Sequence, residues 1–360
     1  MKRSKLRRPA RARDSSVLSL RLWEFTGNVL LNTFIWVALV VYLFPLSYML
    51  ITSLKTSAQM RDVKSPIWPA NAVTFHYNGK DLLVYNVPTA TGNQHLALVE
   101  THIPYSMFVD PSHPQAGLVR WDGYWGDLKL VYVPGITFEN FINHWETVNY
   151  PNLLKNTAII IILGEIGMLC SSILVAYGFA RFRVPAGRFL FFLMIGTIMI
   201  PDSITLVPTF IIFGRVLNWT GTFYPLLVPQ FFGSAIYIFL LRQNFKTIPR
   251  DLDEAAMLDG AGPLRTLVSV ILPQSIPTVV TVALLHFFNA WNELKMASLY
   301  LGVRPDLQTV AFSTQFSQGV GFTPEGLQAA ALMLMVIPLL VLFLSQRFFM
   351  QDMVLASVEK

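Results

Sequence analysis

The stretch EAAMLDGAGPLRTLVSVILP, residues 254–273, joins an alanine-rich run to an apolar run through a Gly-Ala-Gly-Pro break. Gly260 is suited to end a helix, and Pro263, which follows Gly262, is suited to begin another. Pro249 is suited to the first turn of the first helix. Three carboxylates put negative charge near the positive end of its dipole: Asp251, Asp253 and Glu254. The stretch therefore predicts two helices that meet at a sharp corner.

Four side chains of the first helix share one face through the i, i+3, i+4 spacing: Leu252, Ala255, Ala256 and Asp259. The small alanines allow another surface to approach this face closely. The pattern is consistent with a docking surface. An ordinary helix that links two membrane helices has the same local pattern, so helix geometry alone leaves both interpretations open.

The composition of the whole chain indicates a membrane protein. Of its 360 residues 53% are hydrophobic and 13% are charged, and the mean hydropathy is +0.49. Apolar runs of about 18 or more residues are long enough to cross a bilayer as helices. Six such runs occur, at 28–53, 156–180, 189–214, 216–243, 266–292 and 326–346. The first is too long for a cleaved signal peptide, so we expect a retained anchor. The single cysteine, Cys170, excludes an internal disulfide.

Lysine and arginine residues near the runs predict their orientation. The basic tail 1–27, which begins MKRSKLRRPARARDSS, is expected in the cytoplasm. With six alternating spans, the tail 351–360 is expected there too, and the corner in 254–273 lies on the same side. The net charge of +6 is explained by this asymmetry, so we expect no nucleic-acid partner.

The segment 54–151, between the first two spans, has the pattern of strands. Asn78-Gly79 between β-rich flanks is a strong hairpin signal, and GLVRWDGYWGDLKLVYV, residues 117–133, is a second strand–turn–strand pattern. We expect a small β-rich lobe outside the membrane. Its histidines lack metal-ligand spacing, so we expect no metal site. They are His76, His95, His102, His113 and His144.

Ionisable side chains inside spans cost about 3 kcal/mol near the bilayer centre on insertion scales, so each is a functional candidate. Glu165 is expected to pair with a neighbouring helix or to face the bundle interior, rather than to touch the solute. Asp202, which follows Pro201, is expected in a span with a broken backbone. The run HFFNAWNELK, residues 286–295, combines amides, a carboxylate and an indole, groups that bind hydroxyls and stack on sugar faces. The candidates for a solute path are Asp202, His286, Asn289, Trp291, Asn292 and Glu293. For Trp291, an interfacial aromatic belt is the competing interpretation.

The spacing Glu254-Ala255-Ala256, Asp259-Gly260-Ala261 and Leu272-Pro273 resembles the EAA loop of permease subunits in bacterial binding-protein-dependent ABC importers. Other stretches are similar to carbohydrate-importer permeases, in particular the smaller maltose permease subunit. They are SLKT from Ser53, FENF from Phe138, AYGFARFRVPAGR from Ala176, IPDSITLVP from Ile200, FLLRQNFKTIPRDLDEAA from Phe239, WNEL from Trp291 and QRFF from Gln346. The resemblance leaves out about residues 72–134. It also departs at Leu267, where the family often has Phe, and at Lys295, where the family has an apolar or aromatic residue.

The resemblance implies an all-α polytopic membrane protein of a bacterial cell membrane. It implies six transmembrane helices and a core permease domain over 152–350, and the strand patterns of 54–151 add the expectation of a small β-rich extracytoplasmic insertion between the first and second helices. The loop 249–273 would dock on a cytoplasmic ATPase, with Glu254 and Asp259 as polar contacts or caps and Gly260 as the corner. The full set of coupling residues is Glu254, Ala255, Ala256, Asp259, Gly260, Ala261 and Gly262.

The resemblance also implies the partners. They are two ATP-binding subunits, a second permease subunit, an extracytoplasmic solute-binding protein, a sugar and membrane lipid. We expect no cofactor, no metal and no ATPase site in this chain. Its only Gly-Lys pair, Gly79-Lys80, lies in the outer lobe and lacks the phosphate-loop pattern.

Two alternatives stay open. A permease of this type for glycerol phosphate, a peptide or an amino acid would have the same loop. A membrane-embedded enzyme or sensor is less favoured, because a single span histidine, His286, with no cysteine or acidic motif beside it is poor support for a catalytic site. Such an enzyme would also have no need of a cytoplasmic docking loop.

Overall fold

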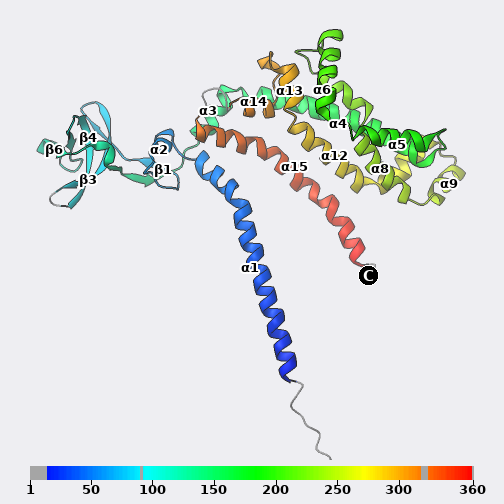
Figure 1. Cartoon of the computed structure of the whole chain (residues 1–360), viewed down its shortest axis with the longest axis horizontal. Coiled ribbons are helices and arrows are strands. Elements are labelled where there is room, and N and C mark those ends of the chain that lie inside the picture. Colours follow the sequence, from blue (N-terminus) through cyan, green and yellow to red (C-terminus); the bar gives the residue numbers. More distant parts are fainter. Residues whose placement is uncertain (1–13, 90–91, 318–322, 359–360) are drawn as a thin grey trace, which may run out of the picture.

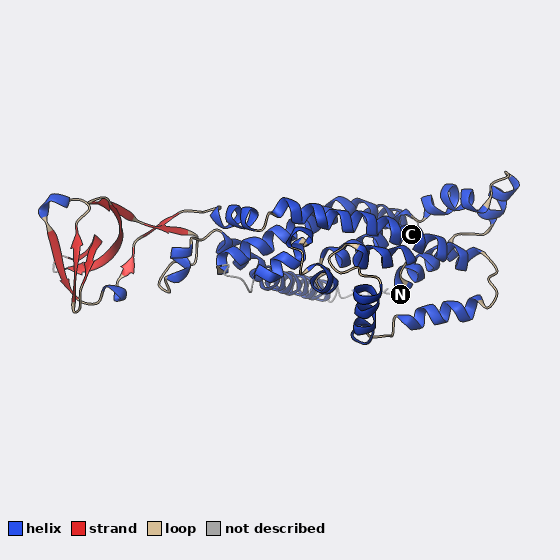
Figure 2. Ribbon diagram, turned by 90° about the horizontal axis from the view of Figure 1, so that it is seen from above, coloured by secondary structure: helices blue, strands red, loops and turns tan. Residues whose placement is uncertain are grey.

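The computed structural model describes residues 14–89, 92–317 and 323–358. It consists of a long helical part and a β-rich lobe at one end of the molecule (Figure 1). Seen from above, the lobe follows the helical part along the long axis and is joined to it by a narrow stalk (Figure 2). Helix α1 (Asp14–Ser53) meets the other helices near its C-terminal end and runs away from them.

The helices differ greatly in length. The longer ones after α1 are α4 (Tyr150–Arg181), α8 (Ala235–Thr247), α12 (Ile276–Trp291) and α15 (Pro324–Val358). The shorter ones are α2 (Ser57–Arg61), α3 (Glu139–Thr147), α5 (Gly187–Thr197), α6 (Asp202–Phe210), α7 (Tyr224–Leu227), α9 (Asp251–Leu258), α10 (Pro263–Thr266), α11 (Leu272–Gln274), α13 (Lys295–Leu301) and α14 (Val310–Ser317). A π-helical segment follows α6 over Ile211–Val216, and another follows α10 over Leu267–Ile271.

Four helices of the described chain are long and apolar enough to cross a membrane: Phe25–Ser53, Tyr150–Arg181, Tyr224–Thr247 and Pro324–Phe348. The number rises to six if each of two bent pairs is one span. Gly187–Thr197 and Asp202–Val216 meet at 88°, and Pro263–Gln274 and Ile276–Trp291 meet at 84°. The spans 189–214 and 266–292 that the sequence predicts therefore fall on bent helices.

The first bend lies where the sequence predicts a broken backbone. Pro201 has an extended conformation with ψ of 134°, and α6 begins at Asp202. The second bend, at Ser275, was not predicted. Pro277 lies in the first turn of α12. Because its ring clashes with the carbonyl four residues earlier and it has no N–H, Pro277 favours a kink or break in the helix at this point.

The fourth span begins later than the sequence predicts. Its helix starts at Tyr224 rather than at 216, because the chain turns at Asn218, where φ is +55°. Asparagine tolerates this left-handed conformation better than most residues. The spans on α4 and α15 are longer than predicted.

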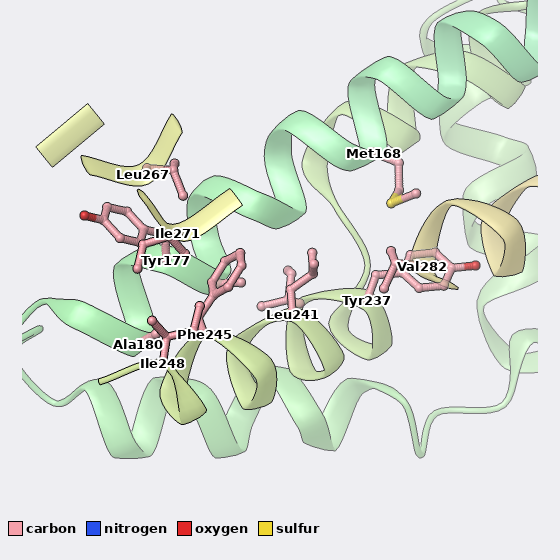
Figure 3. Packing of buried hydrophobic residues seen from close by; sticks show 12 residues of the cluster. Met168, Tyr177, Ala180, Tyr237, Leu241, Phe245, Ile248, Leu267, Ile271 and Val282 are labelled. Carbon is pink, nitrogen blue, oxygen red and sulfur yellow. The ribbon is translucent and has the colours of Figure 1, made fainter. Parts of the chain in front are cut away.

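The main apolar core of the helical part joins α4 to α8 and to the π-helical segment 267–271 (Figure 3). Met168 and Tyr177 of α4 and Leu241 and Phe245 of α8 are buried in it, with Ile271 against them. Since lipid is as apolar as these side chains, close packing rather than exclusion of water stabilises such a contact. The core therefore holds α4, α8 and the chain after α10 as one unit.

The strands of the lobe form two sheets. Its stalk pairs β1 (Ala70–Ala72) with β8 (Tyr132–Pro134), and the larger sheet has the order β2-β3-β4-β5-β6 with β7 beside β3. These strands are β2 (Thr74–Tyr77), β3 (Lys80–Thr89), β4 (Gly92–Thr101), β5 (Tyr105–Val109), β6 (Leu118–Asp122) and β7 (Lys129–Leu130). Because Ala70 lies opposite Pro134, the chain enters and leaves the lobe at one place.

The two strand patterns in the sequence have different outcomes. Asn78 and Gly79, with φ of +48° and +77°, form the turn of the β2–β3 hairpin, as predicted. In 117–133 the strands form but do not pair with each other, because β6 pairs with β5 and β7 pairs with β3. Trp125, in the turn between them, packs against Tyr85 of β3, and this contact brings the following chain to β3.

Candidate functional site

The corner predicted from 254–273 is present, and its hydrogen bonds are those of a Schellman motif. Helix α9 ends before Gly260, which has φ of +79°. The Gly260 N–H donates to the Met257 carbonyl at 3.0 Å, and the Ala261 N–H donates to the Ala256 carbonyl at 2.9 Å. Helix α10 then begins at Pro263. Glycine is favoured at 260 because other residues are strained at this φ.

Most of the predicted coupling residues lie at the surface of this corner. Glu254, Ala255, Asp259, Gly260 and Gly262 are exposed. Ala256 and Ala261 are half-buried, while Leu258 is 90% exposed. The corner therefore presents small, acidic and apolar groups to its surroundings.

Asp253 behaves differently from the neighbouring carboxylates. It is buried, and its Oδ2 lies 2.8 Å from Nε of Arg181 at the end of α4. A terminal nitrogen of Arg181 also donates to the Ile248 carbonyl at 3.0 Å. One turn earlier on α4, the Tyr177 hydroxyl donates to the Pro263 carbonyl at 3.2 Å. Helix α4 thus contacts both helices that meet at the corner, α9 through Asp253 and α10 through Pro263.

The sequence did not reveal this ion pair. Asp253 was assigned only to the helix dipole, and Arg181 was considered only as one of the lysine and arginine residues near the apolar runs that predict orientation. The two residues are far apart in the sequence, and only the packing of α4 on α8 brings them together.

The second part of the site is a cavity of about 510 Å³ between α4, α7, α8 and α12. His286 of α12 lies in its wall, with Nδ1 2.7 Å from Oε2 of Glu165 and Nε2 3.1 Å from Oε1 of Gln230. Beside it, the Asn289 amide donates to the Tyr237 hydroxyl at 2.9 Å. These contacts fix the side chains that face the cavity.

The carboxylate of Glu165 determines how His286 is presented. It accepts from Nδ1–H, so Nε2 is the nitrogen directed toward Gln230. A neutral imidazole would accept there from the amide nitrogen of Gln230, and an imidazolium would donate to its oxygen. The expectation that Glu165 pairs with a neighbouring helix is confirmed.

The cavity is suited to a polar solute without strong charge. Its wall offers amide, phenol, imidazole and carboxylate groups from Gln230, Asn289, Tyr237, His286 and Glu293, among apolar side chains. The described residues that line it include no lysine or arginine. Glu293 is already partly engaged, because its Oε1 accepts from the Met296 N–H at 2.8 Å.

The structure brings together three of the six candidate path residues, His286, Asn289 and Glu293. Trp291 is buried away from the cavity, where its indole N–H donates to the Leu334 carbonyl of α15 at 3.1 Å. Asn292 donates to the Phe288 carbonyl, and Asp202 is exposed at the start of α6. These three do not line the cavity.

Sequence reasoning missed Gln230 and Tyr237. Each is a single polar residue in a mostly apolar run, without a charge that would mark it. Within the described residues, no group of three or more His, Cys, Asp or Glu side chains is placed to hold a metal ion.

The chain matches known proteins over most of the helical part. The family model "Binding-protein-dependent transport system inner membrane component" matches residues 167–354. A probable ABC transporter permease protein of Pyrococcus horikoshii is 32% identical over 62% of this chain and 82% of its own length. An sn-glycerol-3-phosphate transport system permease protein of Pectobacterium atrosepticum is 28% identical over 66% of this chain and 82% of its own length. A trehalose/maltose transport system permease protein of Thermococcus litoralis is 34% identical over 58% of this chain and 76% of its own length.

A solved structure has a similar fold. It is a bacterial ABC transporter involved in the import of the acidic polysaccharide alginate, and the similarity covers 95% of this chain and 100% of the matched chain. The TM-score is 0.63 at 17% sequence identity. At this identity the similarity shows the fold alone.

Proposed function

Because the chain belongs to the family of binding-protein-dependent transport system inner membrane components, we propose that it forms part of the path of a sugar or oligosaccharide in an ABC importer. Its relatives are permease subunits, which are components of transport rather than enzymes. We assign the solute path to the cavity beside His286, in a bundle of six spans of which two are bent. The lining of that cavity is the observation that carries this proposal.

The lining favours an uncharged hydroxylated solute over an organic phosphate. Hydroxyl groups can both donate to and accept from the amides of Gln230 and Asn289 and the phenol of Tyr237. A phosphate is usually met by arginine or lysine, and the described lining residues include neither. His286 does not supply a free positive charge, because Glu165 lies 2.7 Å from it.

The exposed corner supports coupling to ATPase subunits. In this proposal Glu254, Asp259 and the alanines between and after them dock on a cytoplasmic ATPase. The Arg181–Asp253 ion pair carries the displacement of the corner to α4. Since α4 also carries Glu165, the same helix reaches the cavity. One continuous helix would therefore link the docking surface to the solute path.

The remaining partners follow from the same proposal. The cavity is not fully enclosed by this chain, so a second permease subunit would complete the path. A soluble binding protein would deliver the solute on the side of the lobe. We assign to the lobe contact with that binding protein or with the second permease, because it extends beyond the helices (Figure 1) and supplies no lining residue of the cavity.

The test is reconstitution of the complete complex in vesicles with its binding protein. The expected result is ATP-dependent uptake of a neutral sugar and no uptake of glycerol 3-phosphate. The isolated chain should not hydrolyse ATP. Uptake of glycerol 3-phosphate without any neutral sugar would refute the solute assignment, and robust hydrolysis by the isolated chain would refute the permease assignment.

A further inference from the structure

A second hollow, of about 700 Å³, lies between the end of α4, the loop 182–186, α5 and α8. It shares no lining residue with the cavity beside His286. Helix α4 ends at Arg181, and the span of α8 ends at Thr247. The hollow therefore lies at the level where two candidate spans leave the membrane, on the same side as the corner.

Four cations converge on this hollow: Arg183, Arg188, Arg242 and Lys246. Its described lining includes no carboxylate, and none of the ion pairs found in the described chain involves these four residues. Like charges gathered in one place repel each other unless an anion lies among them. The hollow is thus prepared for a negatively charged group.

Arg242 is held in position before any ligand binds. Its guanidinium carbon lies 3.9 Å from the centre of the Phe191 ring, and its Nε donates to the Phe179 carbonyl at 3.3 Å. Its two terminal nitrogens have no hydrogen-bond acceptor among the described residues. A guanidinium oriented in this way can bind two oxygens of a phosphate at once.

The other walls of the hollow are aromatic. Phe179, Phe182, Phe191, Phe192 and Phe239 line it, and Phe182 and Phe192 are 49% and 60% exposed. A free inorganic anion would make no favourable apolar contact with these rings. A ligand that matches both features has a phosphate at one end and a hydrocarbon chain at the other.

We propose that this hollow binds an anionic phospholipid, with the phosphate between Arg242, Arg188 and Lys246 and an acyl chain along the phenylalanines. Basic pockets between membrane helices on the cytoplasmic side are suited to such headgroups. The position of the hollow at the span ends places the phosphate at headgroup depth. The lipid would contact α8 directly before the chain turns into α9.

The experiment uses the assembled importer complex, extracted from vesicles of phosphatidylglycerol with phosphatidylcholine. Bound lipid is counted by native mass spectrometry. The native complex is expected to retain phosphatidylglycerol over phosphatidylcholine. Arg242→Gln should weaken this retention roughly fivefold, and Arg188→Gln by a similar factor. Arg242→Lys should give a retention between those of the native complex and Arg242→Gln, because lysine keeps the charge but lacks the paired N–H donors of the guanidinium. The matched control is Arg215→Gln, an exposed arginine at the far end of a bent span.

Several results would overturn the proposal. One is equal retention of both lipids by the native complex, and another is an equal loss in Arg215→Gln. Displacement of the lipid by millimolar inorganic phosphate would assign the hollow to a free anion. Retention only after removal of the ATPase subunits would assign it to an acidic segment of that partner. If Arg242→Gln fails to assemble, Arg188→Gln decides, because Arg188 is exposed and its nearest ring lies 5.9 Å away.

Discussion

The lobe and the helical part place their polar and apolar side chains in opposite ways. In the lobe, Val87, Leu96 and Phe108 are buried and the charged residues lie outside. In the helical part, large apolar side chains cover the surface, and two carboxylates, Asp253 and Glu165, lie inside, each paired with a nitrogen of another helix. Burying apolar side chains stabilises the lobe because it removes them from water. The helical part is surrounded by lipid, which is as apolar as these side chains, so their burial gives it no such stabilisation. A buried charge costs free energy unless it is paired. The paired charges of the helical part therefore mark where function is to be sought.

The largest expected effect comes from separating the ion pair that holds the corner. Asp253→Ala leaves Arg181 buried without a carboxylate, which costs roughly 3–5 kcal/mol. We expect uptake per ATP hydrolysed to fall at least tenfold in the reconstituted complex. Asp251→Ala, at an exposed position of the same helix, is the control.

A double substitution tests whether the pairing itself is responsible. In Arg181→Met with Asp253→Leu no charge remains buried, and apolar replacements of such pairs are often close to neutral in stability. We expect assembly to recover in the double variant. If it is as unstable as Asp253→Ala, the ion pair does not hold the corner.

The next effect concerns the carboxylate behind the cavity. Glu165→Leu leaves Nδ1 of His286 without an acceptor, a loss of about 1–3 kcal/mol, and should lower the uptake rate about tenfold. Glu165→Gln keeps an acceptor for Nδ1–H and should retain most of the rate. Equal loss in both variants would mean that the charge, and not the orientation of His286, is what the cavity requires.

The two glycines of the corner offer a matched pair. A Cβ at Gly260 would meet no atom within 4 Å, so Gly260→Ala costs only the strain of its positive φ, about 1–2 kcal/mol. Gly262, with φ of −73°, accepts alanine without this strain. We expect Gly260→Ala to raise the ATP hydrolysed per solute moved severalfold and Gly262→Ala to leave it unchanged. Gly260→Pro should be worse, since it also removes the N–H that bonds to Met257.

Removal of the lobe tests its independence from the helices. Because the stalk strands pair at Ala70 and Pro134, a short Gly/Ser linker in place of 72–134 can close the chain without strain. We expect normal membrane insertion and ATPase assembly, with weaker apparent affinity for the loaded binding protein. Unchanged affinity in an assembled variant would leave the lobe without a role in capture.

The smallest effect is a pH dependence near the junction of the two regions. His144 of α3 is buried, and burial lowers its pKa from the usual value. In the unfolded chain the imidazole of His144 has a pKa of about 6.5. As the pH falls, it therefore binds a proton in the unfolded state before it does so in the folded state. The unfolding free energy should decrease below about pH 6.5 and be constant above it. His144→Gln should reduce this slope in chemical denaturation of the complex, whereas His95→Asn, at an exposed position, should not.

Local features of the sequence predicted much of the fold. The Asn78-Gly79 hairpin, the break before Asp202 and the corner at Gly260 all depend on residues within one turn of each other. The bend at Ser275 was not predicted, although Pro277, two residues later, favours a break in the helix. An apolar run of sufficient length indicates a span but does not show whether the helix is straight.

The sequence by itself determined that this chain crosses a membrane, where some of its turns lie and which short helix is exposed. Hydropathy, proline and glycine act over a few residues, so their effects can be read in order along the chain. Only the tertiary structure decided which polar groups meet. Arg181 with Asp253, and Glu165 with His286 and Gln230, are joined by the packing of α4 against α8 and α12. Such contacts depend on how whole helices rotate and cross, and side-chain packing across the bundle sets that geometry.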